Sequence, residues 1–461
     1  MNWKSTLVAL VVLLGVGGYF LFVAQPEHKL EAAAEAQKTV LTTFEDKQIQ
    51  SLEIQRGGER LVAKRAGEKK WRITEPIEAL GDRHALDGIA RKLAKLTAKR
   101  FVREAADDLA PFGLQEPKVT VTATSDSGQV VTVMLGASNE FDDTVFARTA
   151  DLTRVVGVDK EVLAAADKSL HDLREKKLLD FEQKDATKVT VELAGKDPFV
   201  LEKRGEDWHL AKPIEERADK STASSVLSTL RNVRAESFEQ ERVAALADHG
   251  LDQPALHAVV EVQGQEGPVE LWVAAPPEGT EDVAKVTLLA SAGVGQPVAK
   301  VKGHVVKNVD KSLFDLRDKQ LLRFERKAVR RIKVTRGESF YIVEGEGDPV
   351  EWQLAAPKQG AVKKHKVSSL LSSLSYLKAK EFADEAPGAL APFGLEKPER
   401  QVELFGEENK PLATLLVGQA EGEFYFAKGA AQQRVSKIDK KAADRWAWNV
   451  EDVQETGEKK P

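Results

Sequence analysis

Three stretches of the chain place apolar residues at spacings of three and four, the pattern of a helix with one apolar stripe. The stripes are Leu86, Ile89, Ala90, Leu93 and Leu96; Ala223, Val226, Leu227, Leu230 and Val233; and Val367, Leu370, Leu371, Leu374 and Leu377. Asp82 and Asp219 precede the first two stripes at one offset and suit an N-cap, where a side-chain oxygen accepts hydrogen bonds from free backbone N–H groups. Lys363 holds that position in the third stretch, so we expect a different cap there.

Alternation of apolar and polar residues predicts strands on both sides of each helix. Before the first helix, "SLEIQRGGERLVAKRAGEKKWRIT" alternates around Gly57-Gly58 and Gly67 and predicts a three-strand meander. After it, "KVTVTATSDSGQVVTVMLG" predicts a hairpin turning at Ser127-Gly128, and "VFARTA" and "RVVGVD" predict two more short strands. The other two stretches repeat this layout. The predicted fold class is therefore α+β, with an antiparallel β-meander, one main amphipathic helix and further β-hairpin strands in each copy.

Tryptophan, glycine and proline keep one register in the three copies. Trp71, Trp208 and Trp352 are each followed five residues later by a proline, namely Pro76, Pro213 and Pro357. Counting 42 residues from each tryptophan reaches Gly113, Gly250 and Gly394, and four more reach Pro117, Pro254 and Pro398. The copies are offset by 137 and 144 residues, which is longer than solenoid or propeller repeats, so each copy is a domain.

The glycine belongs to a repeated phrase, "APFGLQEP" at 110–117 and "APFGLEKP" at 391–398, with a weaker form "DHGLDQP" at 248–254. Glycine permits a backbone conformation that side chains resist, and proline stops a helix, so we interpret the phrase as a turn whose Leu114, Leu251 or Leu395 tucks into the core. A ligand loop is the alternative. We likewise interpret the tryptophans as core residues rather than sugar-stacking rings, the prolines as strand ends, and the position of Phe112, His249 and Phe393 as packing. Phe101, Phe238 and Phe382 follow each helix at one offset.

The N-terminus carries an uncharged apolar stretch, "STLVALVVLLGVGGYFLFVA", at residues 5–24. As a helix it would extend about 30 Å, the thickness of a bilayer core, so we expect an uncleaved N-terminal transmembrane helix. A cleaved secretory signal is the alternative, although its apolar region would be shorter and Phe22 stands where a small residue is wanted. Lys4 favours a cytoplasmic start, whereas Lys29 and Lys38 weaken that orientation.

The expected organisation follows from these elements. It is a cytoplasmic tail at 1–4, the anchor at 5–24, a spacer at 25–43, α+β repeats at 44–180, 181–323 and 324–450, and a disordered tail at 451–461. Between the repeats, "LREKKLLDFE" at 173–182 and "LRDKQLLRFE" at 316–325 predict a short helix that runs into the next strand and leaves little free linker.

Composition excludes several function classes. With no cysteine, the chain has no disulfide, thiol nucleophile, cysteine-bound zinc or lipoprotein anchor. The 68 basic and 73 acidic residues are well mixed and show no nucleic-acid-binding stripe. The eight histidines stand at 28, 84, 171, 209, 249, 257, 304 and 365, with no pair at i, i+4. Asp107-Asp108 and Asp142-Asp143 fit solvated turns better than acid–base catalysts, and "LREKK" and "VKKHK" fit solvated helix faces better than lipid contacts. We therefore predict no catalytic, cofactor-binding or metal-binding residues, and a protein that is not an enzyme.

The order W-x-h-x-x-P, amphipathic helix, F-G-L-x-x-P, hairpin and "LRxKxLLxFE" resembles the bacterial domain of unknown function 4340, in three copies from about Phe44 to Val450. The middle copy departs at "DHGLDQP", and the last lacks a clear "LRxK" end and finishes in "DRWAW". The resemblance implies no catalytic residues. It implies an envelope protein related to those encoded beside ABC-type transport components of the gliding-associated kind.

We therefore expect a single-pass inner-membrane protein whose bulk is periplasmic or otherwise extracytoplasmic. It would bind or scaffold envelope protein partners, such as ABC transporter components, without nucleic acid. The alternative function is cell-wall glycan or peptidoglycan binding.

Overall fold

The computed structural model describes residues 41–42, 44–67, 70–103, 106–139, 141–150 and 153–455. These residues fold into three α+β modules, each built on one nine-stranded antiparallel sheet. The modules divide between two compact units, one ending at Lys177 with the first repeat and one starting at Leu178 with the second and third repeats.

Within a module, two meanders meet at the centre of the sheet. In the first repeat the strand order is β4-β3-β2-β1-β6-β7-β8-β9-β5. The chain starts at the centre in β1, winds out to β4, passes through helix α3 to the opposite edge at β5, and returns to the centre at β6. The elements are β1 (Ile49–Arg56), β2 (Glu59–Arg65), β3 (Trp71–Glu75), β4 (Ala79–Gly81), α3 (Arg83–Ala94), β5 (Arg100–Arg103), β6 (Val119–Ser125), β7 (Val130–Asn139), β8 (Thr144–Thr149), β9 (Val155–Asp159), α4 (Lys160–Ala166) and α5 (Leu170–Leu173).

The second repeat has the same strand order, from β13 through the central pair β10 and β15 to β14. Its elements are β10 (Ala186–Leu193), β11 (Phe199–Arg204), β12 (Asp207–Lys212), β13 (Glu216–Arg217), α6 (Lys220–Arg231), β14 (Ser237–Gln240), β15 (Leu256–Val262), β16 (Val269–Val273), β17 (Thr287–Ser291), β18 (Val298–Lys302), α7 (His304–Val309) and α8 (Leu313–Leu316).

The third repeat again places its first strand beside its sixth, here β19 beside β24. Its elements are β19 (Arg331–Arg336), β20 (Ser339–Glu346), β21 (Glu351–Ala356), β22 (Gly360–Ala361), α9 (Lys364–Ser375), β23 (Glu381–Asp384), β24 (Arg400–Phe405), β25 (Pro411–Glu421), β26 (Phe424–Gly429), β27 (Val435–Asp439), α10 (Lys440–Asp444) and α11 (Val450–Val453).

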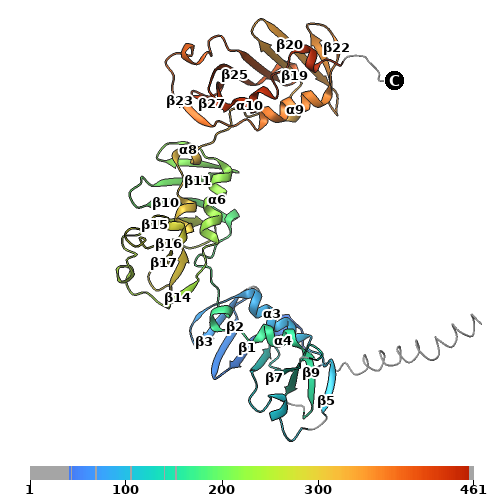
Figure 1. Cartoon of the computed structure of the whole chain (residues 1–461), viewed down its shortest axis with the longest axis vertical. Helices are drawn as coiled ribbons and strands as arrows, with labels where there is room; N and C mark the ends of the chain where they lie inside the picture. The colour runs from blue at the N-terminus through green and yellow to red at the C-terminus, as the bar shows by residue number, and fades with distance from the viewer. Residues whose placement is uncertain are drawn as a thin grey trace, which may run out of the picture. The chain divides into compact units, whose positions relative to one another are not determined.

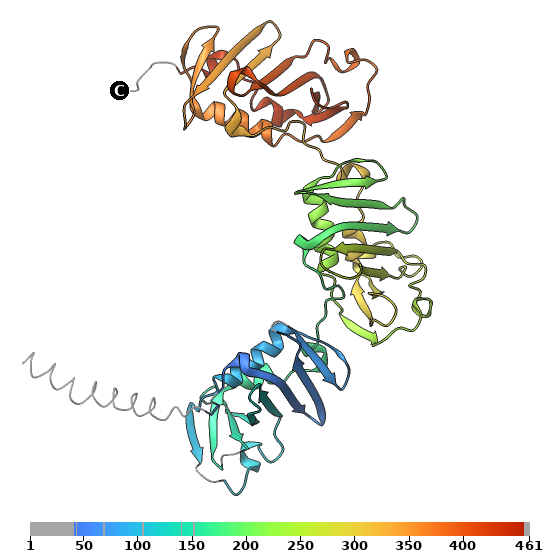
Figure 2. The same cartoon turned by 180° about the vertical axis from the view of Figure 1, so that it is seen from behind.

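The helices lie on one face of each sheet, and the main core forms between them (Figure 1). The first four residues of each predicted stripe are buried on α3, α6 and α9. The fifth, which is Leu96, Val233 or Leu377, is buried just beyond the end of the helix. Strand residues at alternate positions complete the core, as in β6, where Val119, Val121 and Ala123 are buried. Figure 2 shows the opposite face of the second repeat, where the strands carry no helix. Each module is thus a one-sided antiparallel sheet with its helices on the buried face.

The predicted caps are confirmed. Asp82 accepts a hydrogen bond from the Ala85 N–H at 2.9 Å, and Asp219 accepts one from the Thr222 N–H at 3.0 Å. Lys363 makes no side-chain cap bond in α9, so the third helix does begin differently. The predicted meander is present but gains a short fourth strand, and the sequence did not reveal the edge strand or the second helix of each module.

The predicted connector helix is wrong in position. In both connectors the helix ends at the first leucine of the motif, as α5 does at Leu173 and α8 at Leu316. The following arginine is extended, with φ −89° and ψ 150° at Arg174. Ser169 and Ser312 cap these short helices, which explains why the helix lies upstream of the motif. The basic run "LREKK" is also not a solvated helix face, because Arg174 is buried.

Two predicted boundaries need correction at their edges. The spacer was expected to reach residue 43, but Leu41 already packs against the first core and Thr42 is buried. The tail was expected from residue 451, but Val450–Val453 form α11 and Val453 belongs to the third core. The expected tail at 1–4, anchor at 5–24 and remaining spacer lie outside the described residues. In the part of the chain that the structure describes, no helix has both the length and the apolar character needed to cross a bilayer.

Candidate functional site

The residues that the sequence singled out serve packing. Trp71 and Trp208 are buried in the cores of their repeats, and Trp352 is partly buried against the third core. The Trp71 indole N–H donates to Asp87 at 2.9 Å, and the Arg65 guanidinium lies 4.4 Å from the centre of its ring. The core interpretation of the tryptophans is thereby confirmed, and Pro76, Pro213 and Pro357 follow the last residues of β3, β12 and β21 as predicted.

The repeated phrase forms a turn. Ala110–Phe112 make one 3₁₀ turn that ends at Gly113, whose φ is +64°. A Cβ on Gly113 would lie 2.9 Å from the backbone nitrogen of Ala137, so this glycine is needed both for its conformation and for a close approach. Leu114 is buried, as are Leu251 and Leu395 in the other copies. These leucines do not enter the main core, however, because Leu251 and Leu395 belong to separate small clusters.

The aromatic position inside the phrase also serves packing. Phe112 meets Phe146 edge to face at 5.2 Å between ring centres, and Phe393 meets Phe426 in the same way at 5.1 Å. His249, which replaces the phenylalanine in the second copy, forms a hydrogen bond with Gln240 at 2.8 Å. The substitution exchanges an aromatic contact for a polar one.

Candidate catalytic carboxylates and histidines are not brought together. Among the described residues, no group of three or more histidine, aspartate or glutamate side chains could hold a metal ion. Asp142 and Asp143 lie in a turn, where they pair with Arg100 at 2.9 Å and Lys160 at 2.5 Å, and Asp108 accepts from the Ala110 N–H at 2.9 Å. His257 lies between Glu192 and Glu270 and stacks on Trp272 with ring centres 4.6 Å apart.

A cluster of charged groups lies in the second compact unit, where the connector leaves the second repeat for the third. Leu316 packs in the second core, whereas Leu321 and Leu322 pack in the third. The connector is therefore held at both ends by buried leucines. Between them stands Arg317, of which only 5% is exposed.

Arg317 binds one carboxylate from each repeat. Its Nε and Nη2 atoms both donate to Glu216 of the second repeat, at 2.8 Å in each case. Its Nη1 and Nη2 atoms donate to Glu385 of the third repeat, at 2.6 and 2.7 Å. Two-pronged pairs of this kind fix orientation as well as distance, because the planar guanidinium matches two carboxylate oxygens at once.

Further contacts surround this pair. Arg434 of the third repeat donates to both oxygens of Glu216 at 3.0 and 3.1 Å. The guanidinium groups of Arg317 and Arg434 lie 4.4 and 4.1 Å from the centre of the Phe382 ring. Phe314 of α8 meets that ring edge to face at 4.8 Å. We call this set, Glu216, Phe314, Arg317, Phe382, Glu385 and Arg434, the junction cluster.

The charges of the cluster shift the pKa values of its acids. Burial by itself raises the pKa of Glu216, but hydrogen bonds from Arg317 and Arg434 outweigh burial and hold that pKa below its ordinary value. The hydrogen bonds that Arg317 donates to Glu385 lower the pKa of Glu385 and raise the pKa of Arg317. All of these groups stay charged at neutral pH.

Asp219 adds a second tie between the two repeats. It caps α6 in the second repeat, is 4% exposed, and accepts a hydrogen bond from Lys378 of the third repeat at 3.1 Å. Burial raises its pKa, but the Ser221 hydroxyl, the Thr222 N–H and Lys378 together lower it far below the ordinary range. A helix cap thus also serves as an ion-pair partner across the junction.

The third repeat closes the series differently. Asn449 caps α11 as Ser312 caps α8, and Val453 is buried where Leu316 is buried. Gln454 pairs with Val362 through an isolated bridge, as Arg317 pairs with Ala218. Gln454, Glu451 and Gly360 therefore stand in the places of Arg317, Phe314 and Glu216. The segment "NVEDVQ" therefore corresponds to the start of the two connectors, but it lacks the arginine and the phenylalanine of the junction cluster.

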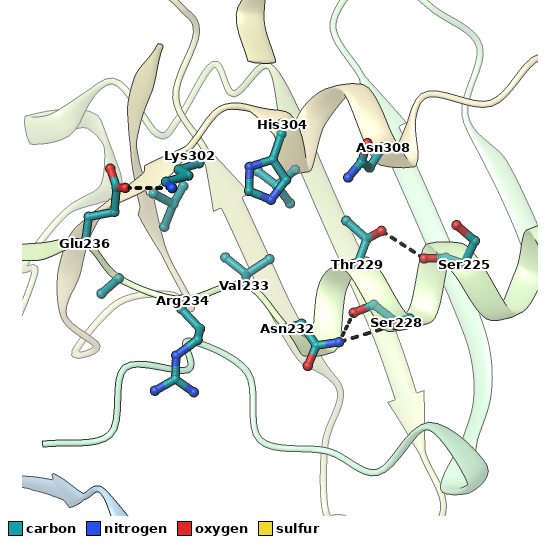
Figure 3. Close-up of a pocket in the computed structure, with 13 residues that line it drawn as sticks. Ser225, Ser228, Thr229, Asn232, Val233, Arg234, Glu236, Lys302, His304 and Asn308 are labelled. Carbon is teal, nitrogen blue, oxygen red and sulfur yellow. Dashed lines mark hydrogen bonds and ion pairs between the residues drawn. The ribbon is translucent and has the colours of Figure 1, made fainter. Parts of the chain in front are cut away.

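A cleft of about 570 Å³ lies elsewhere on the second repeat, between α6 and α7 (Figure 3). Ser225, Ser228 and Thr229 line it from α6, Asn232 from the C-terminal cap of that helix, and His304 and Asn308 from α7. In the first repeat Lys92 and Glu161 form an ion pair between the corresponding helices, α3 and α4. The second repeat has Thr229 and His304 at those positions and forms no such ion pair there. The groove is lined by hydroxyl and amide groups together with charged residues such as Arg234 and Lys302.

Sequence reasoning missed the junction cluster because its members lie far apart in the chain. One signal was available: the arginine recurs in "LREKK" and "LRDKQ" directly after a leucine that is buried in both copies. Nothing in the sequence indicated that Glu216 and Glu385 would meet it.

Comparison with known protein families identifies one family that matches this chain. The model of a family described as a domain of unknown function, DUF4340, matches residues 71–254, 208–351 and 352–460. No curated protein matches. Among solved structures, a DNA polymerase sliding clamp from Pseudomonas aeruginosa is similar at 7% identity and a TM-score of 0.13, covering 87% of this chain and 93% of that one. The DNA polymerase III subunit beta of the same organism is similar at 9% identity and a TM-score of 0.13, covering 85% and 91%. Likenesses at this level carry no argument about fold or function.

Proposed function

We propose a function from the premise that this chain belongs to the DUF4340 family, with a match in each of its three repeats. The protein is a non-enzymatic, membrane-anchored scaffold whose bulk lies outside the cytoplasm. Its repeats present binding surface to envelope proteins, among them components of an ABC-type transport system of the gliding-associated kind.

The junction cluster is the observation that supports a scaffold. Arg317 pairs with carboxylates of two repeats, and Arg434 and Lys378 tie the third repeat back to the second. Arg317 is buried, and its two-pronged pairs with the partly exposed Glu216 and Glu385 resist rotation more than a single exposed pair would. Two repeats held in this way offer a partner a preorganised surface, which lowers the entropy cost of binding.

Two further parts of the proposal come from the sequence. The apolar stretch at 5–24 supports an anchor in the inner membrane, with the repeats on the far side. The transport system comes from the family resemblance, since related envelope proteins are encoded beside such transporters.

Copurification tests the scaffold. The full-length protein, tagged at its C-terminus, is captured from detergent-solubilised membranes, and residues 1–40 fused to the same tag serve as the control for the anchor. We expect transporter subunits or other envelope proteins to be enriched over the control. Equal recovery from both baits would contradict the proposal.

The cleft on the second repeat favours one alternative, a cell-wall glycan binder, because hydroxyl and amide side chains form the hydrogen bonds that sugars offer. Sedimentation with purified peptidoglycan separates the two functions. A glycan binder would lose sedimentation on Ser228→Leu, which fills the cleft, and keep it on Ser372→Leu at the same helix position in the third repeat. Sedimentation that is absent, or insensitive to Ser228→Leu, removes this alternative.

A further inference from the structure

The third repeat has a surface that binds the chain arriving from the second repeat. Phe382 and Arg434 form a surface, which we call the receiving face, onto which the connector and Glu216 pack. Arg434 takes the Glu216 carboxylate and also donates to the backbone oxygen of Asp318 at 3.2 Å. The receiving face therefore binds a carboxylate and a stretch of incoming main chain.

The first repeat has the same face. Phe101 lies on β5 as Phe382 lies on β23, and Arg154 precedes β9 as Arg434 precedes β27. The Arg154 guanidinium lies 5.1 Å from the centre of the Phe101 ring. Among the described residues, the Arg154 Nε atom is buried and has no hydrogen-bond partner. A buried donor of this kind is costly to leave unpaired, so the face is suited to an acceptor.

The chain also reaches the first repeat by the same route as it reaches the others. The Leu41 N–H donates to the Leu96 carbonyl at 2.9 Å, just as Leu178 donates to Val233 at 3.1 Å and Leu321 to Leu377 at 3.0 Å. "LTTF" at 41–44 thus takes the place of "LLDF" and "LLRF". In the second connector Arg317 stands four residues before Leu321. The residue four positions before Leu41 is Gln37, so Gln37 corresponds to Arg317 in sequence.

We propose that residues 25–40 of this chain dock on the receiving face of the first repeat, with the carboxylate of Glu35 paired to Arg154. Gln37 is neutral where Arg317 is charged, so the incoming segment brings no guanidinium to this face, but its glutamates can supply a carboxylate for Arg154. Glu35 is the acid nearest to Gln37, and the segment also carries Glu27 and Glu31. Charge complementarity and the point at which the chain arrives both select this occupant.

A second copy of the chain fits this face less well. Docking by another copy would use the C-terminal end of its third repeat, where Gly360, Glu451 and Gln454 replace Glu216, Phe314 and Arg317. That end lacks the acid and arginine that bind across the junction cluster.

The inference rests on the proposed anchoring, because docking of residues 25–40 would hold the first repeat at a set angle to the membrane helix. An undocked segment would leave the first repeat free to swing. The two ideas can fail separately, since docking is measured on the purified chain without any partner.

Amide hydrogen–deuterium exchange on the full-length protein in nanodiscs tests the docking. We expect the amides of residues 33–40 to exchange about tenfold or more faster in Arg154→Glu than in the unaltered chain, because the docked segment is released. Glu35→Arg should release it as well, and the double variant Arg154→Glu/Glu35→Arg should restore slow exchange. Arg91→Glu, an exposed arginine on α3, is the matched control and should change nothing.

The double variant separates docking from damage to the fold, since a misfolded first repeat would not regain slow exchange on a second substitution. Exchange in residues 33–40 that is the same in Arg154→Glu as in the unaltered chain overturns the proposal. So does an Arg154→Glu chain that keeps slow exchange there but loses an envelope protein in copurification, because the face would then belong to that protein.

Discussion

The glycine that ends the 3₁₀ turn of the repeated phrase differs in its surroundings between the two copies of the second compact unit. Gly250 and Gly394 have nearly the same φ, +66° in each case. A Cβ on Gly394 would lie 2.8 Å from the Gln419 nitrogen, whereas nothing lies within 4 Å of a Cβ on Gly250. The conformation is therefore shared, whereas the close approach, present at Gly113 and Gly394, is missing at Gly250.

This contrast gives a matched prediction. Gly250→Ala should cost about 1–2 kcal/mol of unfolding free energy, the cost of a left-handed alanine. Gly394→Ala should cost about 1–3 kcal/mol more, because the strand backbone must also shift. Urea unfolding of the two variants measures the difference. Equal losses would show that the contact at Gln419 is relieved without cost.

The lowered pKa of Asp219 implies that the unfolding free energy of the second unit falls at acid pH. Its pKa is lowered in the folded chain, so its contribution is complete above its ordinary pKa and is lost as the pH falls toward the folded value. Between about pH 4 and about pH 2 the unfolding free energy of the second unit should therefore fall, and Asp219→Asn should make that fall shallower. Thermal unfolding across this range measures the slope. A variant with the unaltered slope would mean that Asp219 does not contribute to the acid dependence.

At the scale of elements, the short helix α8 ties the connector to the second core through one residue. Leu316 is 2% exposed and lies in that core, whereas Leu313, on the same helix, is 40% exposed. Leu316→Ala should cost about 2–5 kcal/mol through the cavity that it leaves, and Leu313→Ala should stay within about 0.5 kcal/mol. Chemical unfolding of both variants tests this. Similar losses would contradict the anchoring role of Leu316.

The helices and the turn could be predicted where a single local pattern in the sequence determined the conformation. The stripes of α3, α6 and α9 and the turn at Gly113 follow from spacing and from glycine chemistry, and both were found from the sequence. The connector was misplaced because the apolar residues of "LREKKLLDFE" were assigned to one helix, although Leu173 and Leu179 belong to two different cores. Local periodicity cannot show that a segment changes cores partway along.

At the scale of the whole molecule, the account describes tandem modules that differ in how they are joined. Arginine follows the buried leucine in both connectors, while glutamine follows the corresponding valine at the end of the third repeat. The junction cluster could not be predicted, because Glu216, Arg317, Glu385 and Arg434 come from four separate segments. Only folding brings their charges together.

The scaffold depends on the second and third repeats behaving as one body, and Arg317 is the residue most directly responsible. Arg317→Ala leaves Glu216 and Glu385 without their shared partner and should cost the junction about 2–3 kcal/mol. Arg323→Ala is the matched control, because Arg323 lies on the same connector and forms its ion pair with Asp318 of that connector.

Hydrogen exchange measured across a urea titration tests this claim most directly, with the amides of α6 reporting on the second repeat and those of α9 on the third. In the unaltered chain and in Arg323→Ala, we predict that both helices lose protection at one common urea concentration. In Arg317→Ala, we predict two separate midpoints. Separate midpoints in the unaltered chain, or a common midpoint that survives Arg317→Ala, would contradict the account.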